Sequence, residues 1–574
     1  MKKIYILGAL LGATALLSSC DDFLNDNREP LSEQVNNTEY WGNTNNVQGQ
    51  LNTLYNSFNG YGHGSSTNGS FYYSWLSDDQ AGRRSFANWT YINVPASSSS
   101  WSSPYEEIRH ANYIIEGVGA SALAESSKND FIGQARLYRA LQYYYLVRAY
   151  GDVPLVTKVL DPADTDEVYG ARTPRNTVMD YVLEDLNDAC ANIGAQSGKT
   201  VFSRDLAHAI KAEICLFEGS YARYHAKDDT RASKYFKEAA DAAEAIAANY
   251  PLCDDYTSLY KSFRTAGGGY TGLSTNGEVI FMQPYENGVL MHSLLDYTSA
   301  SDGVAGITKS AFDAFLFLDG KPKASTTLNN TDKGVMDANG LSIKNLLDVR
   351  DKRLSMITYE YAFFQGQTWG TDNTSAMYST TGYGVSKFNN FTVPQSEVNV
   401  ANKNYTCAPL YWGARLYMDL LEAKAELGTL TDQDLTKYMA PVWKRAGLPA
   451  EKLTVAYLSG INDPANNMGV SSLLWEIRRC RRCELMMDAG IRYWDLIRWH
   501  QLDLLTNAKN PDAFLGVNLS MVPNVSADVR VSGDYLDCSW GMTREMHNNR
   551  EYFYPVPSAQ LTLNKNLKQN PGWD

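Results

Sequence analysis

The chain has 574 residues, of which 44% are hydrophobic and 12% aromatic, so it is long enough to bury a substantial core. Its net charge of −13 and its pI near 5.2 argue against a nucleic-acid partner, because binding phosphates requires clustered Lys and Arg side chains. The composition is that of a globular protein better suited to neutral or cationic ligands.

The first twenty residues have the features of an export signal. A basic pair opens the chain, an apolar run too short to span a bilayer follows, and small residues close the run before Cys20. The stretch reads MKKIYILGALLGATALLSSC. Its end resembles the lipobox of bacterial lipoproteins, which implies a lipid on Cys20; the alternative is an ordinary signal peptide with a chance cysteine. We therefore predict a signal peptide over residues 1–19 and a polar tether over 20–37.

Apolar side chains recur at helical spacing along much of the chain. The stretches with this spacing are 47–58, 105–118, 133–150, 177–191, 203–224, 231–249, 410–427, 432–446, 471–489 and 493–505. In the third of them Tyr143, Tyr144 and Tyr145 are consecutive, so their rings sweep roughly 200° of helix surface. This predicts a helix packed on at least two sides, which ends at Gly151 and whose tyrosines serve packing and interfaces, not ligand binding.

The stretches 203–224 and 231–249 form the clearest pair. They are joined by a short polar link, and small residues alternate with aromatic ones on both. This predicts an αα-hairpin and resembles tetratricopeptide repeats in a degenerate form, since no clean 34-residue period can be read. The fold class that follows is mainly α, built from tetratricopeptide-like helix pairs.

Two regions interrupt the helical pattern. Residues 60–103 and 260–405 are rich in Gly, Ser, Asn and Tyr, and a stretch of this kind is expected to carry function or irregular packing of its own. We predict one folded unit over 38–574. Its helical scaffold would cover about 38–58, 105–255 and 406–505, and a closing segment would cover 506–574.

Several motifs occur in an order that resembles one known family. They are CDDFL from Cys20, ARLYRALQYYYLVRAYGDVPLV at 135–156, DKRL at 351–354, RRCRRCELMMDAGIRYWDLIRW at 478–499, YPVP at 554–557 and QNPG at 569–572. With them the chain is similar to the SusD/RagB family of Bacteroidota surface lipoproteins over the whole length from Cys20. Cys480 and Asp488 depart from the family pattern, which has glutamates there.

The resemblance implies a fold with four tetratricopeptide-like helix pairs and a large irregular region. It also implies a protein without catalytic activity that is anchored by lipid at the outer surface of the outer membrane. There it would act as a lid on a SusC-like TonB-dependent transporter. Members bind glycans, or in some cases peptides, and pass them to the transporter.

The residues themselves give no sign of catalysis. The chain contains no G-x-S-x-G, HExxH or P-loop motif, and we predict neither a cofactor nor a metal site. Cys480 and Cys483 form the only CxxC and have no second pair nearby, so they are expected to be packing thiols. Asp78 and Asp79 are adjacent, and their diverging side chains do not make the opposed carboxylate pair of a glycosidase.

The two loop-rich regions hold what sugar recognition needs, namely flat rings beside polar side chains. Our preferred stacking platforms are Trp89 and Trp369, with core packing as the alternative for each. The other predicted ligand-binding residues are Asp78, Arg83, Arg84, Asn88, Tyr285 and Asn287. Neutral sugars suit the acidic composition best, although the two arginines could reverse this locally.

The leading hypothesis is thus a surface glycan-binding lipoprotein that is not an enzyme. A peptide-binding counterpart is the second hypothesis, and a glycoside hydrolase is the third.

Overall fold

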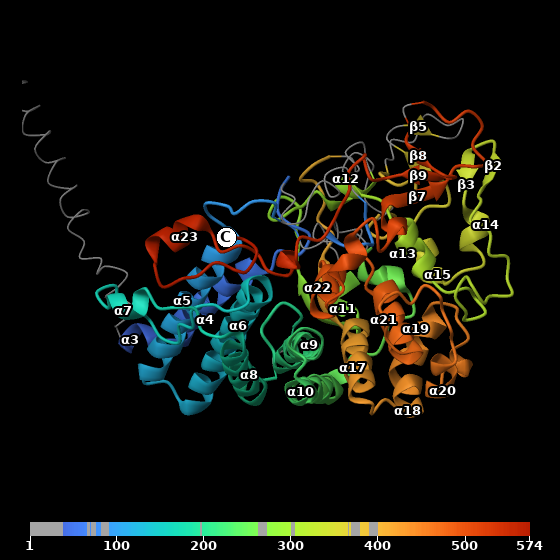
Figure 1. The fold of residues 1–574 in the computed structure, drawn as a ribbon. Helices are drawn as coiled ribbons and strands as arrows, with labels where there is room; N and C mark the ends of the chain where they lie inside the picture. The colour runs from blue at the N-terminus through green and yellow to red at the C-terminus, as the bar shows by residue number, and fades with distance from the viewer. Residues whose placement is uncertain are drawn as a thin grey trace, which may run out of the picture.

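The computed structural model describes residues 38–65, 69, 76–81, 91–195, 198–261, 272–299, 305–364, 367–368, 379–389, 400–527 and 529–574. Long helices lie side by side along one half of the molecule, and irregular segments with short strands cover the other half (Figure 1). The mainly α fold predicted from the sequence is confirmed. The predicted signal peptide and the tether, with Cys20, lie outside the described residues.

The first part of the helical row packs each long helix against its neighbours in the chain. Helix α5 packs against α6, α6 against α8, and α9 against both α8 and α10. The bounds are α3 (Thr38–Trp41), α4 (Thr44–Leu54), η1 (Tyr55–Ser57), α5 (Ser99–Ala120), α6 (Glu125–Tyr150), α7 (Thr165–Val168), α8 (Arg175–Asn192), α9 (Arg204–Tyr221), η3 (Ala222–Ala226) and α10 (Asp229–Ala247). Helix α5 begins six residues before the predicted Tyr105, with Pro104 inside its N-terminal part.

Helix α6 is the central member of this part. Tyr143 and Tyr144 are buried and Tyr145 is half-buried, which confirms packing on at least two sides. The helix ends at Gly151, whose φ of 74° lies in the region that favours glycine. Inside the interface with α8, Arg139 donates two hydrogen bonds of 2.8 Å to the carboxylate of Asp185. A bidentate pair of this kind fixes the register of the two helices.

The predicted αα-hairpin is formed by α9 and α10. Side-chain caps start both helices: Ser203 accepts a hydrogen bond from Leu206 N, and Asp228 accepts one from Arg231 N. Gly219 lets the helices approach closely, because a Cβ atom there would stand 2.7 Å from the ring of Phe236. The hairpin is thus held by a small residue facing a large one, as the alternation in the sequence predicted.

The row continues in the C-terminal half, where α10 packs against α17 and α17 against α21. The bounds are β6 (Ala408–Trp412), α17 (Gly413–Leu427), α18 (Asp432–Asp434), η5 (Leu435–Met439), α19 (Ala440–Arg445), η6 (Ala450–Lys452), α20 (Val455–Ser459), α21 (Ser472–Glu484), α22 (Ile491–Arg498) and η7 (Leu502–Leu505).

Three predicted boundaries in this half were wrong. The helix expected over 493–505 ends at Arg498, and His500 after it has a φ of 55°. The helix expected from Leu410 begins at Gly413, because residues 408–412 form strand β6 and pair with β1 (Val279–Gln283). The helix expected to reach Ala489 ends at Glu484. Met487 and Ala489 have φ angles of 66° and 48°, which no right-handed helix contains.

The irregular half has a hydrophobic core of its own. Phe312, Phe315, Leu354, Val385 and Val517 belong to this core, which is separate from the core of the helical row. Its short elements are η4 (Tyr256–Leu259), α11 (Gly272–Thr275), α12 (Leu294–Ser299), α13 (Lys309–Ala314), β2 (Val335–Asp337), β3 (Gly340–Ser342), α14 (Lys344–Leu347), α15 (Lys352–Ile357), β4 (Phe363–Phe364), β5 (Gln367–Thr368), η8 (Pro511–Phe514), β7 (Leu515–Asn518), β8 (Val531–Ser532) and β9 (Tyr535–Asp537). The last two elements of the chain, η9 (Arg550–Tyr552) and α23 (Ser558–Leu563), lie instead against the helical row, where Tyr552 and Leu561 pack with its core.

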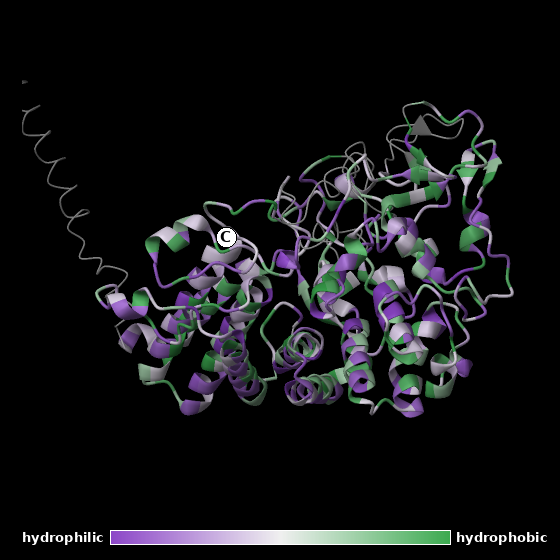
Figure 2. Ribbon diagram, viewed as in Figure 1, coloured by the Kyte–Doolittle hydropathy of each residue, from purple (hydrophilic) through white to green (hydrophobic). Residues whose placement is uncertain are grey.

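Helix α21 lies between the two cores. Cys480 packs in the core of the helical row and Cys483 in that of the irregular half, as expected for packing thiols. Burial raises the pKa of Cys480 to about 12, so this thiol stays protonated and unreactive at neutral pH. In Figure 2 hydrophobic and hydrophilic residues alternate along the helices of the row, as expected for helices packed on more than one side.

The arginines of α21 form a buried network of ion pairs. Arg478 donates to Glu422 and Glu426, and Arg481 donates to Asp419 and to Asp495 of α22. Burial alone would raise the pKa of Glu422, but Arg498 and Arg478 hold it at about 2. The network therefore ties α17, α21 and α22 together through charged groups that are all partnered.

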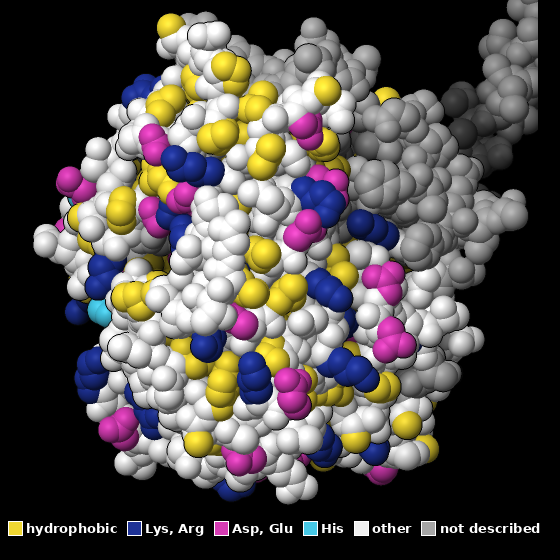
Figure 3. All heavy atoms as spheres, turned by 90° about the vertical axis from the view of Figure 1, so that its right-hand side faces the viewer, with side chains coloured by type: hydrophobic (Ala, Val, Ile, Leu, Met, Phe, Trp, Pro, Cys, Tyr) yellow, Lys and Arg dark blue, Asp and Glu magenta, His cyan; other side chains and the backbone are white. Residues whose placement is uncertain are grey.

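The surface of the irregular end mixes both charge signs. Figure 3 shows Lys and Arg side chains interspersed with Asp, Glu and apolar ones on that face. Among the described residues, no helix is both long enough and apolar enough to cross a membrane.

Candidate functional site

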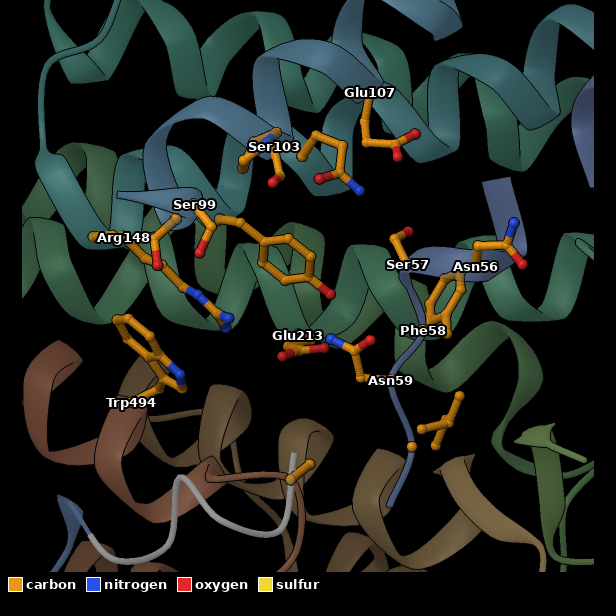
Figure 4. Close-up of a pocket in the computed structure, with 18 of the residues that line it drawn as sticks. Asn56, Ser57, Phe58, Asn59, Ser99, Ser103, Glu107, Arg148, Glu213 and Trp494 are labelled. Carbon is orange, nitrogen blue, oxygen red and sulfur yellow. The ribbon is translucent and has the colours of Figure 1, made fainter. Parts of the chain in front are cut away.

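A cavity of about 520 Å³ lies where the first helices of the row meet β6 and α22. Side chains from η1, α5, α6, α9, β6, α17 and α22 line it (Figure 4). Its walls thus come from segments that are far apart in the sequence and that only the folded chain brings together.

The cavity lies at the base of the first loop-rich region. Asn56 to Gly60, where that region starts, and Ser99, Ser100 and Ser103, where it ends, line opposite parts of the cavity. Leu410 and Tyr411, which follow the second loop-rich region, also line it. Both predicted ligand-facing regions therefore connect to this cavity through the backbone.

Arg148 of α6 presents a positive charge to the cavity. Its guanidinium lies 4.0 Å from the ring centroid of Trp494 and 4.5 Å from that of Tyr145. Burial would lower the pKa of Arg148, but Tyr144, Tyr145 and Glu213 raise it, so the group is charged. Within the described part of the chain, Arg148 has no carboxylate within ion-pair distance and its Nε has no hydrogen-bond partner.

Glu213 of α9 supplies a negative charge whose position is fixed. Its Oε2 accepts a hydrogen bond of 2.7 Å from the Tyr411 hydroxyl and forms an ion pair of 2.7 Å with Arg415. Arg415 in turn donates to the Leu410 carbonyl. In Figure 4 the Glu213 carboxylate lies beside Asn59, and the Arg148 side chain extends over Trp494 toward it. Burial, followed by Glu213, raises the pKa of Tyr411 well above its ordinary value.

Gln142, about one helical turn before Tyr145 and two before Arg148, brings an amide to the cavity wall. Its side chain is only 3% exposed, yet its Nε2 lacks a hydrogen-bond partner among the described residues. Gln134, on the same helix and equally buried, donates instead to Asp130 at 3.0 Å. A buried amide without a partner costs folding free energy, so Gln142 needs an explanation that Gln134 does not.

A third polar group lies on the α5 side. Glu107 and Ser103 face the cavity, together with Ser57, which forms a hydrogen bond of 2.6 Å with the Tyr138 hydroxyl. Burial raises the pKa of Tyr138 far above its ordinary value, and Glu107 adds to the shift. The tyrosine is therefore neutral, and the carboxylate of Glu107 remains an acceptor on this wall.

Together these groups make a cavity suited to binding a polar organic molecule. Donors, acceptors and aromatic rings alternate around it, and this mixture binds hydroxyl groups and apolar C–H faces at once. Across the described residues no cluster of His, Cys, Asp and Glu could hold a metal ion. The arrangement fits recognition of a ligand.

Two of the predicted ligand-binding residues are buried in structural roles. Tyr285 is 5% exposed; its hydroxyl accepts a hydrogen bond from Tyr61 N and lies 3.0 Å from the Gly62 carbonyl. Asp78 is 1% exposed and pairs with Arg492 through bonds of 2.7 and 2.9 Å. Contact with a ligand, the role predicted for both residues, requires an exposed side-chain surface. Because both side chains are buried, neither offers one. Tyr285 instead fixes the chain just beyond the cavity.

Asn287 is exposed, in the turn between Glu286 and Leu290. It does not line the cavity. The remaining predicted ligand-binding residues lie outside the described residues: Trp89, Trp369, Arg83, Arg84 and Asn88.

Sequence reasoning missed the cavity residues because they occupy ordinary helical positions. Gln142, Tyr145 and Arg148 lie within the helix that was assigned to packing alone, and Trp494 lies within another predicted helix. The one available signal was the spacing of the first three, since positions i, i+3 and i+6 share one side of a helix.

Comparison with known proteins gives matches in both halves of the chain. The model of the SusD family matches residues 266–573, and a model described as "Starch-binding associating with outer membrane" matches residues 22–216. A SusD-like protein P2 of Formosa agariphila is 28% identical over 177 residues, which are 30% of this chain and 32% of the relative. A SusD-like protein of Bacteroides ovatus is 27% identical over 174 residues, 29% of this chain and 30% of the relative. The matched part is thus about a third of these relatives' length.

Solved structures share the fold. A SusD-like carbohydrate-binding protein of Bacteroides fragilis superposes with a TM-score of 0.69 at 21% identity, over 92% of this chain and 100% of the other. A laminarin-binding SusD-like protein gives a TM-score of 0.54 at 19% identity, over 92% and 99%. At these identities the likeness concerns the fold alone.

Proposed function

The chain belongs to the SusD family, and from this membership we propose that it captures a glycan at the cell surface without catalysing a reaction. We further propose that it delivers the glycan to a SusC-like TonB-dependent transporter in the outer membrane. A lipid on Cys20 would hold it at the membrane surface. The family match over residues 266–573 is the observation that carries this proposal.

Two further observations support the glycan as ligand. A structural neighbour is described as laminarin-binding and another as carbohydrate-binding. Both ends of the first predicted ligand-facing region also line a cavity that combines aromatic rings with hydroxyl, amide and carboxylate groups. Rings pack against the C–H faces of sugars, while polar groups pair with their hydroxyls.

Binding would begin at the loop-rich face. There Trp89 and Trp369 would stack on sugar rings, and Arg83, Arg84, Asn88 and Asn287 would bind hydroxyl groups. Asp78 and Tyr285 would act indirectly, since both side chains are buried and hold the loop against the scaffold. The role of the protein is then capture by a preformed surface, with chemistry left to other proteins.

Titration of the purified protein against a broad panel of polysaccharides and oligosaccharides tests this proposal. We expect at least one glycan to bind, and Trp89→Ala and Trp369→Ala to weaken binding about tenfold, since stacking on one ring contributes about 1–2 kcal/mol. Tyr169→Ala removes an exposed ring at the end of α7, outside the predicted ligand-facing regions, and serves as the control. Binding of peptides but no glycan would reject the glycan and favour the peptide-binding alternative. Turnover of a glycoside by the pure protein would reject the non-enzymatic role.

The membrane anchor and the transporter need separate tests. Cys20→Ser is expected to move the protein from the membrane fraction to the soluble fraction, and an unchanged distribution would reject the lipid anchor. Co-expression with a SusC-like transporter from the same organism should yield a complex that survives purification, while a chain that purifies alone would speak against the partnership.

A further inference from the structure

We propose that the cavity around Gln142 and Arg148 is a second sugar-binding site, which encloses one neutral hexose unit of a bound glycan. The inference rests on the proposed function, because it adds a site and a ligand class to it. It nevertheless uses side chains that the predicted loop site does not contain, so the two sites can be tested apart.

Two buried donor atoms in the cavity wall lack acceptors among the residues that the structure describes. Gln142 Nε2 is buried in the cavity wall and has no acceptor within the described residues, and the same holds for Arg148 Nε. Both atoms are donors, so the missing groups are acceptors. A sugar hydroxyl or ring oxygen can accept from such donors, and it brings the apolar C–H surface that the rings of Tyr145 and Trp494 can cover.

The charged side chains of the cavity balance one another. Two carboxylates, Glu107 and Glu213, and two guanidinium groups, Arg148 and Arg415, line the cavity. Arg415 already pairs with Glu213, which leaves Glu107 and Arg148 on separate walls. A hydroxyl group can donate to Glu107 and accept from Arg148, whereas an anionic sugar would bring a second negative charge close to Glu107. The charges of the lining balance, so an uncharged polyol can bind Glu107 and Arg148 at once without adding a net charge to the cavity.

The cavity has the size and the position that a sugar-binding site requires. A volume of about 520 Å³ lies in the range of pockets that enclose small organic ligands, about 300 to 1,000 Å³. The cavity is also lined by both ends of the loop-rich region that starts at Gly60. The cavity thus lies at the base of that region, and a sugar unit inside it would be surrounded on several sides.

Calorimetric titration of the purified protein with two sets of ligands tests the inference. The first set is neutral di- to tetrasaccharides of glucose, galactose and mannose, and the second is di- to tetragalacturonate. Gln142→Leu removes the amide, and Gln134→Leu is its control on the same helix. Ser103→Trp fills the cavity from α5, and Ser102→Trp places the same ring on an exposed position that does not line it.

We expect a neutral oligosaccharide to bind, with Gln142→Leu and Ser103→Trp each weakening it about tenfold and the two controls changing it less than about twofold. Binding that both cavity variants leave unchanged, while Trp89→Ala and Trp369→Ala each weaken it, would overturn the inference and leave the proposed function standing. Galacturonates that bind more tightly than neutral sugars, with a loss in Gln142→Leu, would overturn the neutral class. Absence of binding for every glycan, in the wild type, would overturn the proposed function itself.

Discussion

The ion-pair network around α21 and the cavity beside α6 both bury polar groups, but they differ in how those groups are partnered. Glu422 accepts hydrogen bonds from Arg498 and from Trp499 Nε1, and Arg481 bridges Asp419 and Asp495. At the cavity, Gln142 has a donor without an acceptor among the described residues. Where every partner is present, the polar groups serve the fold; where one is missing, a ligand can supply it.

Removing Glu422 from the fully partnered network is expected to give the largest change in the free energy of unfolding. Glu422→Ala leaves Arg478 and Arg498 buried without their shared carboxylate, so we expect a loss of about 3–5 kcal/mol in the free energy of unfolding. Chemical denaturation measures it. Glu244→Ala, which removes the surface partner of Lys424, should change stability by less than about 1 kcal/mol. Equal losses of unfolding free energy in the two variants would show that the buried network stabilises the fold no more than a surface ion pair does.

The pH dependence of the same network is the next largest effect. The pKa of Glu422 is about 2 in the folded protein, below its ordinary value of 4.5. A lowered carboxyl pKa stabilises the fold fully above the ordinary value, and this stability is lost as the pH falls from about 4.5 to about 2. The shift corresponds to about 3 kcal/mol.

Denaturation of wild type and Glu422→Ala at several pH values isolates this contribution from other titrating groups. The difference between their unfolding free energies should shrink as the pH falls through that window. A difference that stays constant down to pH 2 would contradict the lowered pKa.

Tyr285→Phe separates a structural role from ligand contact. It removes the hydroxyl that accepts from Tyr61 N, so a backbone N–H beside the cavity loses its partner, and we expect a loss of about 1–2 kcal/mol in stability. Thermal unfolding measures the loss, and ligand titration of the folded variant completes the test. A variant of wild-type stability that binds its glycan more weakly would return Tyr285 to the ligand-contacting role predicted from the sequence.

The helical row was predicted well from the sequence because each helix is marked by residues within its own stretch. Helices α8 and α10 follow from the 3.6-residue spacing of their apolar side chains, and the stop after α6 follows from Gly151. The start of α17 could not be predicted, since β6 exists only through its pairing with β1, which lies far away in the chain. Local spacing carries no information on such pairing.

The site was harder to predict for a different reason. Loop composition pointed to Asp78 and Tyr285 as ligand contacts, but composition does not reveal burial, and both are held inside by Arg492 and by the backbone at Tyr61. Gln142 and Arg148 look like ordinary helix residues in the sequence. What marks them is the absence of partners among the described residues, which appears only in three dimensions.

The two glutamines of α6 give the smallest effect and test the contrast most directly, because they differ in partnership and not in burial. Gln134→Leu breaks the hydrogen bond to Asp130 and should cost about 1 kcal/mol in unfolding free energy. Gln142→Leu replaces an unpartnered amide by an apolar group of similar size, so stability should stay unchanged or rise by up to about 1 kcal/mol. Denaturation of both variants in parallel measures the difference.

A stabilised Gln142→Leu that has lost sugar binding would mean that the amide is kept for the ligand, at the expense of the fold. A loss of stability as large as that of Gln134→Leu would mean instead that Gln142 already supports the fold.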